Sequence, residues 1–283
     1  LINYIKKYDK NIVVVVVGSF PTKFPDLYSK ADCVIVGEPE DFFISWDGDI
    51  EALRLNGSTI LSENLKRLDP LPIPDFSLMD YYKFAYRPML KGPTGFIESS
   101  RGCPYSCGYY CTYGENQGKL IRSFTPAKLV KMMSTLKEQY GFNSFQFRDP
   151  IFGLQKGYID EFTIALIKSN LNIEWGMETR SDLLDVPKLR LMKKAGLRSI
   201  NIGIETPNFS IASGNKRKTD DLNHQFLLIS EAKKLGIRIN AFYILALEED
   251  TYDSCLQTIN YSLGLDTFMA RYSVCTAYPG TRY

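Results

Sequence analysis

The sequence FIESSRGCPYSCGYYC, residues 96–111, joins a short apolar segment to a loop that carries three cysteines. The apolar part has the length and composition of a buried β-strand. Further apolar segments of strand length follow along the chain, so this strand is the first of a series. The predicted strands lie at residues 96–99, 144–148, 173–177, 199–204, 239–245 and 271–275.

Amphipathic segments between most of these strands predict helices with readable ends. The first helix begins after Thr125, with proline at its first position, and ends at Gly141. Others are expected over about residues 185–196, 221–236 and 251–264. Repeated strand–helix alternation requires a parallel sheet with right-handed crossovers. The sequence therefore predicts an α/β fold, a partial (β/α)6 TIM-type barrel over residues 96–283, with its chemistry at the carboxyl ends of the strands.

The first 45 residues predict a different α/β unit. Two apolar runs, residues 12–17 and 33–36, predict parallel strands, and the first is expected to be buried on both faces. Each run is followed by a turn that contains glycine, Gly18-Ser19 and Gly37-Glu38. Ligands of open α/β sheets bind at such strand ends. We expect residues 1–45 to be the C-terminal half of an open α/β domain, and the proline-containing residues 46–95 to be a linker.

The composition argues against several classes of protein. Lys and Arg number 34, Asp and Glu 32, and no basic stripe is visible, so no nucleic-acid partner is expected. No apolar run is longer than seven residues. A membrane helix needs ~20, so no transmembrane segment is expected. The chain begins with Leu1 and ends just after a turn, so we expect a piece of a longer protein.

Three of the six cysteines, Cys103, Cys107 and Cys111, lie within nine residues. Three close thiols without a fourth fit a disulfide framework poorly and suggest a metal site in a reducing compartment. A structural zinc site normally has four protein ligands, and the single histidine, His224, lies more than a hundred residues away. Three thiolates suit a four-iron cluster with one iron open to an outside ligand. The sequence therefore favours a cluster over zinc.

The motif SRGCPYSC, residues 100–107, followed by an aromatic residue and Cys111, resembles the radical S-adenosylmethionine (SAM) enzymes. With the two glycine turns before it, the chain resembles the B12-dependent, or cobalamin-binding, members of that family. The resemblance implies that the three cysteines hold a [4Fe-4S] cluster whose open iron binds SAM. The implied SAM contacts are Tyr110, Arg148, Asp149, Arg180 and Glu205. The implied cobalamin contacts are Gly18, Ser19, Gly37 and Glu38.

The same resemblance implies a reaction class. Reduction of the cluster would cleave SAM to a 5′-deoxyadenosyl radical, and cobalamin would deliver a methyl group to an unactivated carbon. The alternatives are a cyclase, oxygenase or rearrangement enzyme with the same cofactors, and a degenerate cluster-binding barrel without turnover. We expect a cytoplasmic enzyme that takes electrons from a donor such as flavodoxin or ferredoxin. Its substrate stays open among small molecules, lipids, carbohydrates, tetrapyrroles and peptides.

The chain departs from the family pattern at two places. Three and three residues separate the cysteines, where three and two are usual, so an extra tyrosine must bulge from the loop. Residues 246–250, Ala-Leu-Glu-Glu-Asp, stand where a Gly-Leu-Pro-Gly turn is common, and the loss of two glycines predicts reduced backbone freedom. Two purely structural alternatives concern the charged residues. They are an ion pair between Arg148 and Asp149 and another between Glu178 and Arg180.

Overall fold

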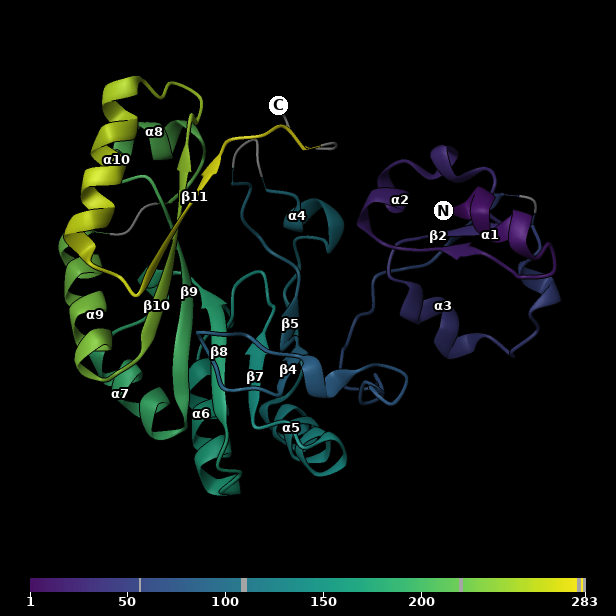
Figure 1. Ribbon diagram of the computed structural model, residues 1–283, viewed down its shortest axis with the longest axis horizontal. Coiled ribbons are helices and arrows are strands. Elements are labelled where there is room, and N and C mark those ends of the chain that lie inside the picture. Colours follow the sequence, from purple (N-terminus) through teal and green to yellow (C-terminus); the bar gives the residue numbers. More distant parts are fainter. Residues whose placement is uncertain (56, 108–110, 219–220, 279–280, 282–283) are drawn as a thin grey trace.

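The computed structural model describes residues 1–55, 57–107, 111–218, 221–278 and 281. The chain forms two parts, each built on its own parallel sheet (Figure 1). The larger part contains the cysteine loop. The smaller part, formed by the first residues of the chain, lies on the opposite side of the larger sheet from helices α9 and α10, whose bounds are given below.

The larger sheet has its strands in the order β11-β10-β9-β8-β7-β4, and all neighbours are parallel. The strands are β4 Thr94–Ile97, β7 Ser144–Phe147, β8 Glu174–Thr179, β9 Leu197–Glu205, β10 Arg238–Leu245 and β11 Met269–Val274. Each strand therefore pairs with the one that follows it in this series, as successive βα units require. Since β4 and β11 do not pair among the described residues, the sheet is open. The predicted partial (β/α)6 barrel is confirmed.

Helices connect these strands and cover the outer side of the sheet (Figure 1). They are α5 Pro126–Tyr140, α6 Tyr158–Ser169, α7 Val186–Lys194, α9 Leu222–Lys234 and α10 Tyr252–Leu265. α5, α7, α9 and α10 begin where the sequence predicts, because Thr125, Asp185, Asp221 and Thr251 cap them with their side chains. The sequence signals miss α6, since the residue before it is a glycine without a side-chain cap.

Alternation along the strands separates the apolar core from a polar interior. Phe147 and Trp175, on the helix side, are fully buried and belong to the main hydrophobic core. Successive residues of a strand point to opposite faces, so Gln146 and Asn201 lie on the other side of the sheet. Asn201 there donates from Nδ2 to the hydroxyl of Tyr86, at 2.8 Å. The face that the helices leave open is therefore polar, and it carries the site.

The smaller sheet contains β1 Val15–Val16, β2 Cys33–Val36 and β3 Ser58–Leu61, parallel and in that order. One expectation is wrong here, and a second segment contains more structure than expected. The strand expected over residues 12–17 is limited to two half-buried residues, because β1 lies at an edge of the sheet. Residues 46–95 are not simply a linker, because β3 extends the first sheet. β3 is Ser-Thr-Ile-Leu and mostly exposed, and its two apolar residues are too few for an apolar-run criterion.

Short elements complete the two parts. Helices α1 Ile2–Tyr8, α2 Ser19–Lys23 and α3 Pro39–Ser45 accompany the smaller sheet, and α4 Tyr113–Asn116 and α8 Phe209–Gly214 the larger one. The antiparallel strands β5 Ser100–Arg101 and β6 Arg122–Ser123 enclose the cysteine loop. Single 3₁₀ turns lie at Pro25–Tyr28, Glu51–Leu53, Tyr81–Lys83 and Ser181–Leu183. Among the described residues, no helix has both the length and the apolar character that crossing a bilayer requires. The domain limits at residues 45 and 95 stay a prediction.

Candidate functional site

The cysteine loop leaves the carboxyl end of β4 and is fastened at its base. The backbone N–H of Cys103 donates to the carbonyl of Gly118 at 3.0 Å. Gly102 has φ +91°, and a Cβ there would lie 2.0 Å from the carbonyl oxygen of Leu120, so the close approach requires glycine. Residues 108–110, with the predicted SAM contact Tyr110 and the extra tyrosine, lie outside the described residues.

The three cysteines line one cavity of about 190 Å³. Cys103 and Cys107 are buried, Cys111 is half-buried, and all three are free thiols. Burial raises the pKa of the Cys103 and Cys111 thiols, so a bound cation is what would hold them as thiolates. The described residues contain no group of three Cys, His, Asp or Glu side chains arranged to hold a single metal ion. Three cysteines that line one cavity supply the thiolates by which iron–sulfur clusters are usually held.

Most of the rest of this cavity comes from β8, β9 and β10 and the segments that follow β7 and β8, with Tyr113 from α4 and Arg217 from the segment after α8. The polar and aromatic residues among its lining, apart from the cysteines, are Tyr113, Glu178, Thr179, Arg180, Asn201, Glu205, Arg217 and Phe242. They are far apart in the sequence, and the parallel sheet brings them to one edge. The structure thus places two of the predicted SAM contacts, Arg180 and Glu205, beside all three predicted cluster ligands.

Arg180 is a buried cation, and one of its guanidinium nitrogens has no hydrogen-bond partner among the described residues. It is only 3% exposed, and its guanidinium lies 4.6 Å from the centre of the Tyr105 ring. Nε and Nη2 bind the two carboxylate oxygens of Asp182 at 2.8 and 3.0 Å. Nη1 is buried without a hydrogen-bond partner among the described residues. An acceptor oxygen of a ligand would satisfy it.

Both structural alternatives for the charged residues are wrong. Arg148 forms an ion pair with Glu178, so Glu178 is not the partner of Arg180. Asp149 is fully buried, and its Oδ1 accepts from the N–H and Oγ of Ser99 and from Oγ of Ser100, at 2.7–2.9 Å. Burial raises its pKa to about 6. Arg148 and Asp149 are not among the residues that line the cysteine cavity, and their roles in SAM binding stay predictions.

Glu205 ends β9 in a left-handed conformation, with φ +66°. Burial raises its pKa, while the nearby guanidinium groups of Arg217 and Arg180 act in the opposite direction. Arg217 lies 3.6 Å from Glu205 and donates to the carbonyl of Gly203 at 2.8 Å. A Cβ on Gly203 would lie 2.5 Å from the Glu205 carboxylate. Sequence reasoning misses Arg217, because it lies in an irregular segment without periodicity.

The turn after β10 keeps a glycine-like backbone without glycine. Ala246 has φ +59° and Glu249 has φ +71°, the two positions where the family pattern has glycine. Asp250 fixes this turn by accepting from the N–H of Leu247 at 2.9 Å. A non-glycine residue in this region costs about 1–2 kcal/mol. The turn thus keeps the backbone conformation that glycine would favour, and Ala246 and Glu249 adopt it at a cost in strain.

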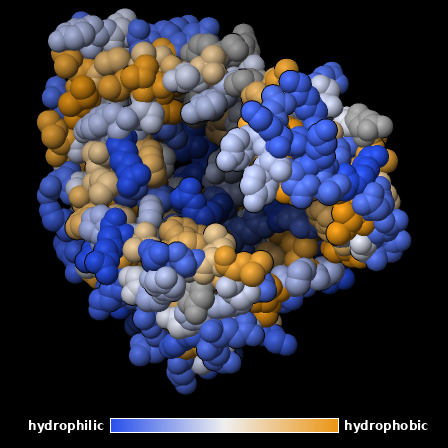
Figure 2. Space-filling model, turned by 45° about the vertical axis from the view of Figure 1, so that its right-hand side comes forward, coloured by the Kyte–Doolittle hydropathy of each residue, from blue (hydrophilic) through white to orange (hydrophobic). Residues whose placement is uncertain are grey.

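A second cavity, of about 450 Å³, lies between the two parts of the chain. Figure 2 shows the surface hollowed there, with hydrophilic residues in the recess. The four predicted cobalamin contacts, Gly18, Ser19, Gly37 and Glu38, all line this cavity. Tyr113, two residues after the last cysteine, lines this cavity and the cysteine cavity, so the two adjoin. Sequence reasoning misses Tyr113, because its position depends on the path of the loop.

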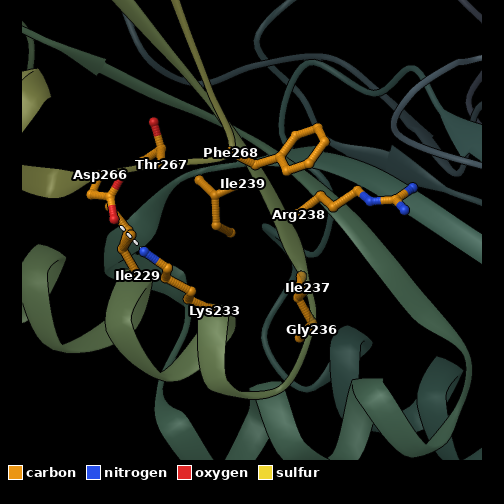
Figure 3. Close-up of a pocket in the computed structure, with 9 residues that line it drawn as sticks. All are labelled: Ile229, Lys233, Gly236, Ile237, Arg238, Ile239, Asp266, Thr267 and Phe268. Carbon is orange, nitrogen blue, oxygen red and sulfur yellow. Dashed lines mark hydrogen bonds and ion pairs between the residues drawn. The ribbon is translucent and has the colours of Figure 1, made fainter.

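A third cavity, of about 400 Å³, lies at the amino ends of β10 and β11. Figure 3 shows Lys233 reaching Asp266, with the ring of Phe268 beside Arg238. It is larger than the cysteine cavity but holds no thiol and no carboxylate free of a partner. The amino ends of barrel strands usually serve stability, so we do not assign the reaction to it.

Comparison with known proteins places the larger part in a family. The Radical SAM superfamily matches residues 97–261. An uncharacterized methyltransferase of Pyrococcus horikoshii is 26% identical over 98% of this chain and 63% of its own length. The anaerobic magnesium-protoporphyrin IX monomethyl ester cyclase of Rubrivivax gelatinosus is 28% identical over 77% of this chain and 38% of its own length. The chain thus spans less than two thirds of these relatives.

A solved structure with a similar fold covers both parts of the chain. It is the cobalamin-dependent SAM radical enzyme OxsB with aqua-cobalamin and SAM bound, with a TM-score of 0.65 and 16% identity. The match covers 96% of this chain and 42% of that one. At this identity the similarity establishes the fold alone.

Proposed function

Because the chain belongs to the radical SAM superfamily, we propose that it is the cofactor-binding part of a cobalamin-dependent radical SAM methyltransferase. The observation that carries this proposal is the pair of adjoining cavities. One is lined by three thiols at the carboxyl ends of the barrel strands, the other by the two glycine turns of the smaller part. Two cofactors that exchange a group must lie side by side, and adjoining cavities allow this.

In this proposal Cys103, Cys107 and Cys111 hold a [4Fe-4S] cluster, and SAM lies in the same cavity. The buried Nη1 of Arg180 has no partner among the described residues, and the SAM carboxylate would supply one. Glu205 would accept from the hydroxyl or amino groups of SAM, and Arg217 holds its carboxylate in place at 3.6 Å. The cluster and SAM would supply radical chemistry, and the protein excludes water from it by burying these groups.

Cobalamin would occupy the cavity between the two parts. Gly18 and Gly37 have φ +117° and +104°, conformations that favour glycine, and both line this cavity at the ends of their strands, so their backbone would border the ligand. Tyr113 forms part of the wall toward the cysteine cavity. The fold shared with a protein solved with aqua-cobalamin and SAM supports this placement.

Methyl transfer is the preferred reaction because the relative that spans most of the chain is named as a methyltransferase. A ring-forming reaction with the same cofactors is the second candidate, and the cyclase relative favours it. We further propose a cytoplasmic setting and a flavodoxin or ferredoxin as electron donor, because an open iron needs low oxygen and a one-electron reductant.

Product analysis separates these candidates. The reconstituted protein is incubated anaerobically with reductant, SAM and hydroxocobalamin, and the nucleoside products are measured by mass spectrometry. A methyltransferase yields 5′-deoxyadenosine from radical cleavage and S-adenosylhomocysteine from methyl donation. A cyclase yields the first product alone, and a barrel without turnover yields neither. Absence of S-adenosylhomocysteine in the presence of bound cobalamin would refute the methyltransferase proposal.

A further inference from the structure

The hairpin that encloses the cysteine loop carries two arginines face to face. Arg101 on β5 and Arg122 on β6 lie directly opposite each other in the antiparallel pair. Like charges in this arrangement repel, and both side chains are largely buried, with 13% and 5% of their surface exposed. The hairpin is therefore stable only with carboxylates beside it, and their source decides how the cysteine loop is held.

Most of these carboxylates come from the smaller part of the chain, from residues 38–40, where the turn after β2 enters α3 (the turn at residues 38–40). Glu38 forms an ion pair with Arg122: its Oε2 accepts from Nη1 at 2.8 Å, and its Oε1 lies 2.8 Å from Nη2. Glu40 accepts from Nη2 of Arg101 at 2.7 Å. The barrel contributes Glu98, which accepts from Nε of Arg101 at 2.7 Å. Among the described residues, no carboxylate of the barrel pairs with Arg122.

The turn presents its carboxylates from a fixed position. Gly37 has φ +104°, and a Cβ there would lie 1.9 Å from the carbonyl oxygen of Ser62. Ser62 in turn donates from Oγ to the carbonyl of Glu38 at 2.5 Å. The N–H of Leu65 donates to Oε2 of Glu38 at 2.9 Å. The same turn and Arg101 line the cavity between the two parts, whereas Arg122 does not.

We propose that Arg101 and Arg122 form an electrostatic latch through which the turn at residues 38–40 holds the base of the cysteine loop. Neither arginine lines the cysteine cavity, so both are positioning residues. The latch joins the cavity between the parts to the loop that carries the cysteines. The hold on the loop is independent of any cofactor, while the link to cobalamin rests on the proposed function.

Hydrogen exchange of the cofactor-free protein tests the hold on the loop. E38Q/E40Q removes both charges with little change in shape. Peptides that cover residues 100–107 and 111–123 are expected to exchange at least tenfold faster in this variant. A tenfold change corresponds to a loss of about 1.4 kcal/mol in the free energy of local opening. E51Q is the matched control, since Glu51 pairs with Arg54 at the surface of the same part. Unchanged exchange in E38Q/E40Q would overturn the latch.

A double-mutant cycle separates repulsion between the arginines from a general loss of folding. E40Q leaves Arg101 short of one carboxylate, and R101M then removes the excess positive charge. Exchange at the loop is expected to be slower in E40Q/R101M than in E40Q alone, because the positive charge that faces Arg122 across the hairpin is then gone. This comparison holds even if E38Q/E40Q fails to fold. Exchange in the double variant as fast as in E40Q, or faster, would contradict the electrostatic origin.

Binding of hydroxocobalamin tests the link between the cavities. R122M is used because Arg122 lies outside the cavity, so weaker binding reports positioning rather than a lost contact. A dissociation constant raised about tenfold is expected, measured by absorbance titration. Equal constants in R122M and the wild type would overturn this link. If the wild type binds no hydroxocobalamin, the proposed function is contradicted rather than the latch. The hydrogen-exchange experiments on the cofactor-free protein then still test the latch.

Discussion

The two ends of the larger sheet carry cavities of unlike chemistry. At the amino ends, the larger cavity has satisfied charges, since Lys233 pairs with Asp266 and Arg238 donates to backbone carbonyls. At the carboxyl ends, the smaller cavity holds three thiols and an Arg180 nitrogen without a described partner. A folded protein keeps buried polar groups unpaired only at a cost, and a ligand removes that cost. Unsatisfied chemistry, rather than volume, therefore marks the reactive end.

Loss of a cysteine ligand should have the largest effect on this contrast. C107S is expected to lower the iron and sulfide bound after anaerobic reconstitution at least tenfold, because a four-iron cluster needs all three thiolates. C255S is the matched control, since Cys255 is half-buried in α10 away from the loop. Iron content that falls equally in both variants would show that the cysteine loop is not the cluster site.

The pH dependence of stability distinguishes a buried acid at the carboxyl end from an exposed one at the amino end. Burial raises the pKa of Asp149 from 3.8 to about 6. The native state therefore binds this proton more tightly, and the stabilisation is complete below about pH 4 and lost as the pH rises through 6. The loss amounts to about 3 kcal/mol.

The free energy of unfolding, measured by urea denaturation between pH 4 and pH 7, tests this value. D149N keeps an acceptor for Ser99 and Ser100 and is expected to lack this part of the decline. D266N, with Asp266 exposed beside Lys233, is expected to retain it. An unchanged decline in D149N would refute the raised pKa.

Two arginines at opposite ends of the sheet sharpen the comparison further. R180K removes the planar fork whose Nη1 has no described partner, and the affinity of the reconstituted protein for SAM is expected to fall about tenfold. R238K changes the amino-end cavity and is expected to leave this affinity unchanged. Isothermal titration gives both values. A loss in R238K equal to that in R180K would contradict the assignment of the ends.

The smallest expected effect concerns strain in the turn after β10. E249G relieves a left-handed residue and is expected to raise the free energy of unfolding by about 1 kcal/mol. E248G is the matched control, because Glu248 has no positive φ, and a loss of about 0.5 kcal/mol is expected there. Thermal and urea denaturation measure both. Destabilisation by E249G would show that the turn is not strained at this position.

Local signals in the sequence were enough for the barrel and for part of the site. Caps such as Thr125 and Asp185 place the helix starts, and the rule that parallel strands share one reactive edge brings Cys103, Arg180 and Glu205 together. The sequence did not predict β3, because this short, mostly exposed edge strand gains its hydrogen bonds from β2 and has only two apolar residues.

The missed side-chain partners depend on tertiary contacts. Arg148 pairs with Glu178 on the neighbouring strand rather than with the adjacent Asp149, because successive residues point to opposite faces. Arg217 reaches Glu205 only because Gly203 leaves room for it. Neither contact is encoded in spacing along the chain.

Electron paramagnetic resonance of the reduced, reconstituted protein, with and without SAM, tests the central claim most directly. The cysteine cavity is expected to give the signal of a reduced [4Fe-4S] cluster, and SAM is expected to shift it by binding the open iron. R238K should leave the shift intact, and R180K should require more SAM to produce it. A protein that binds zinc or no metal, or a cluster signal that SAM leaves unchanged, would contradict the account.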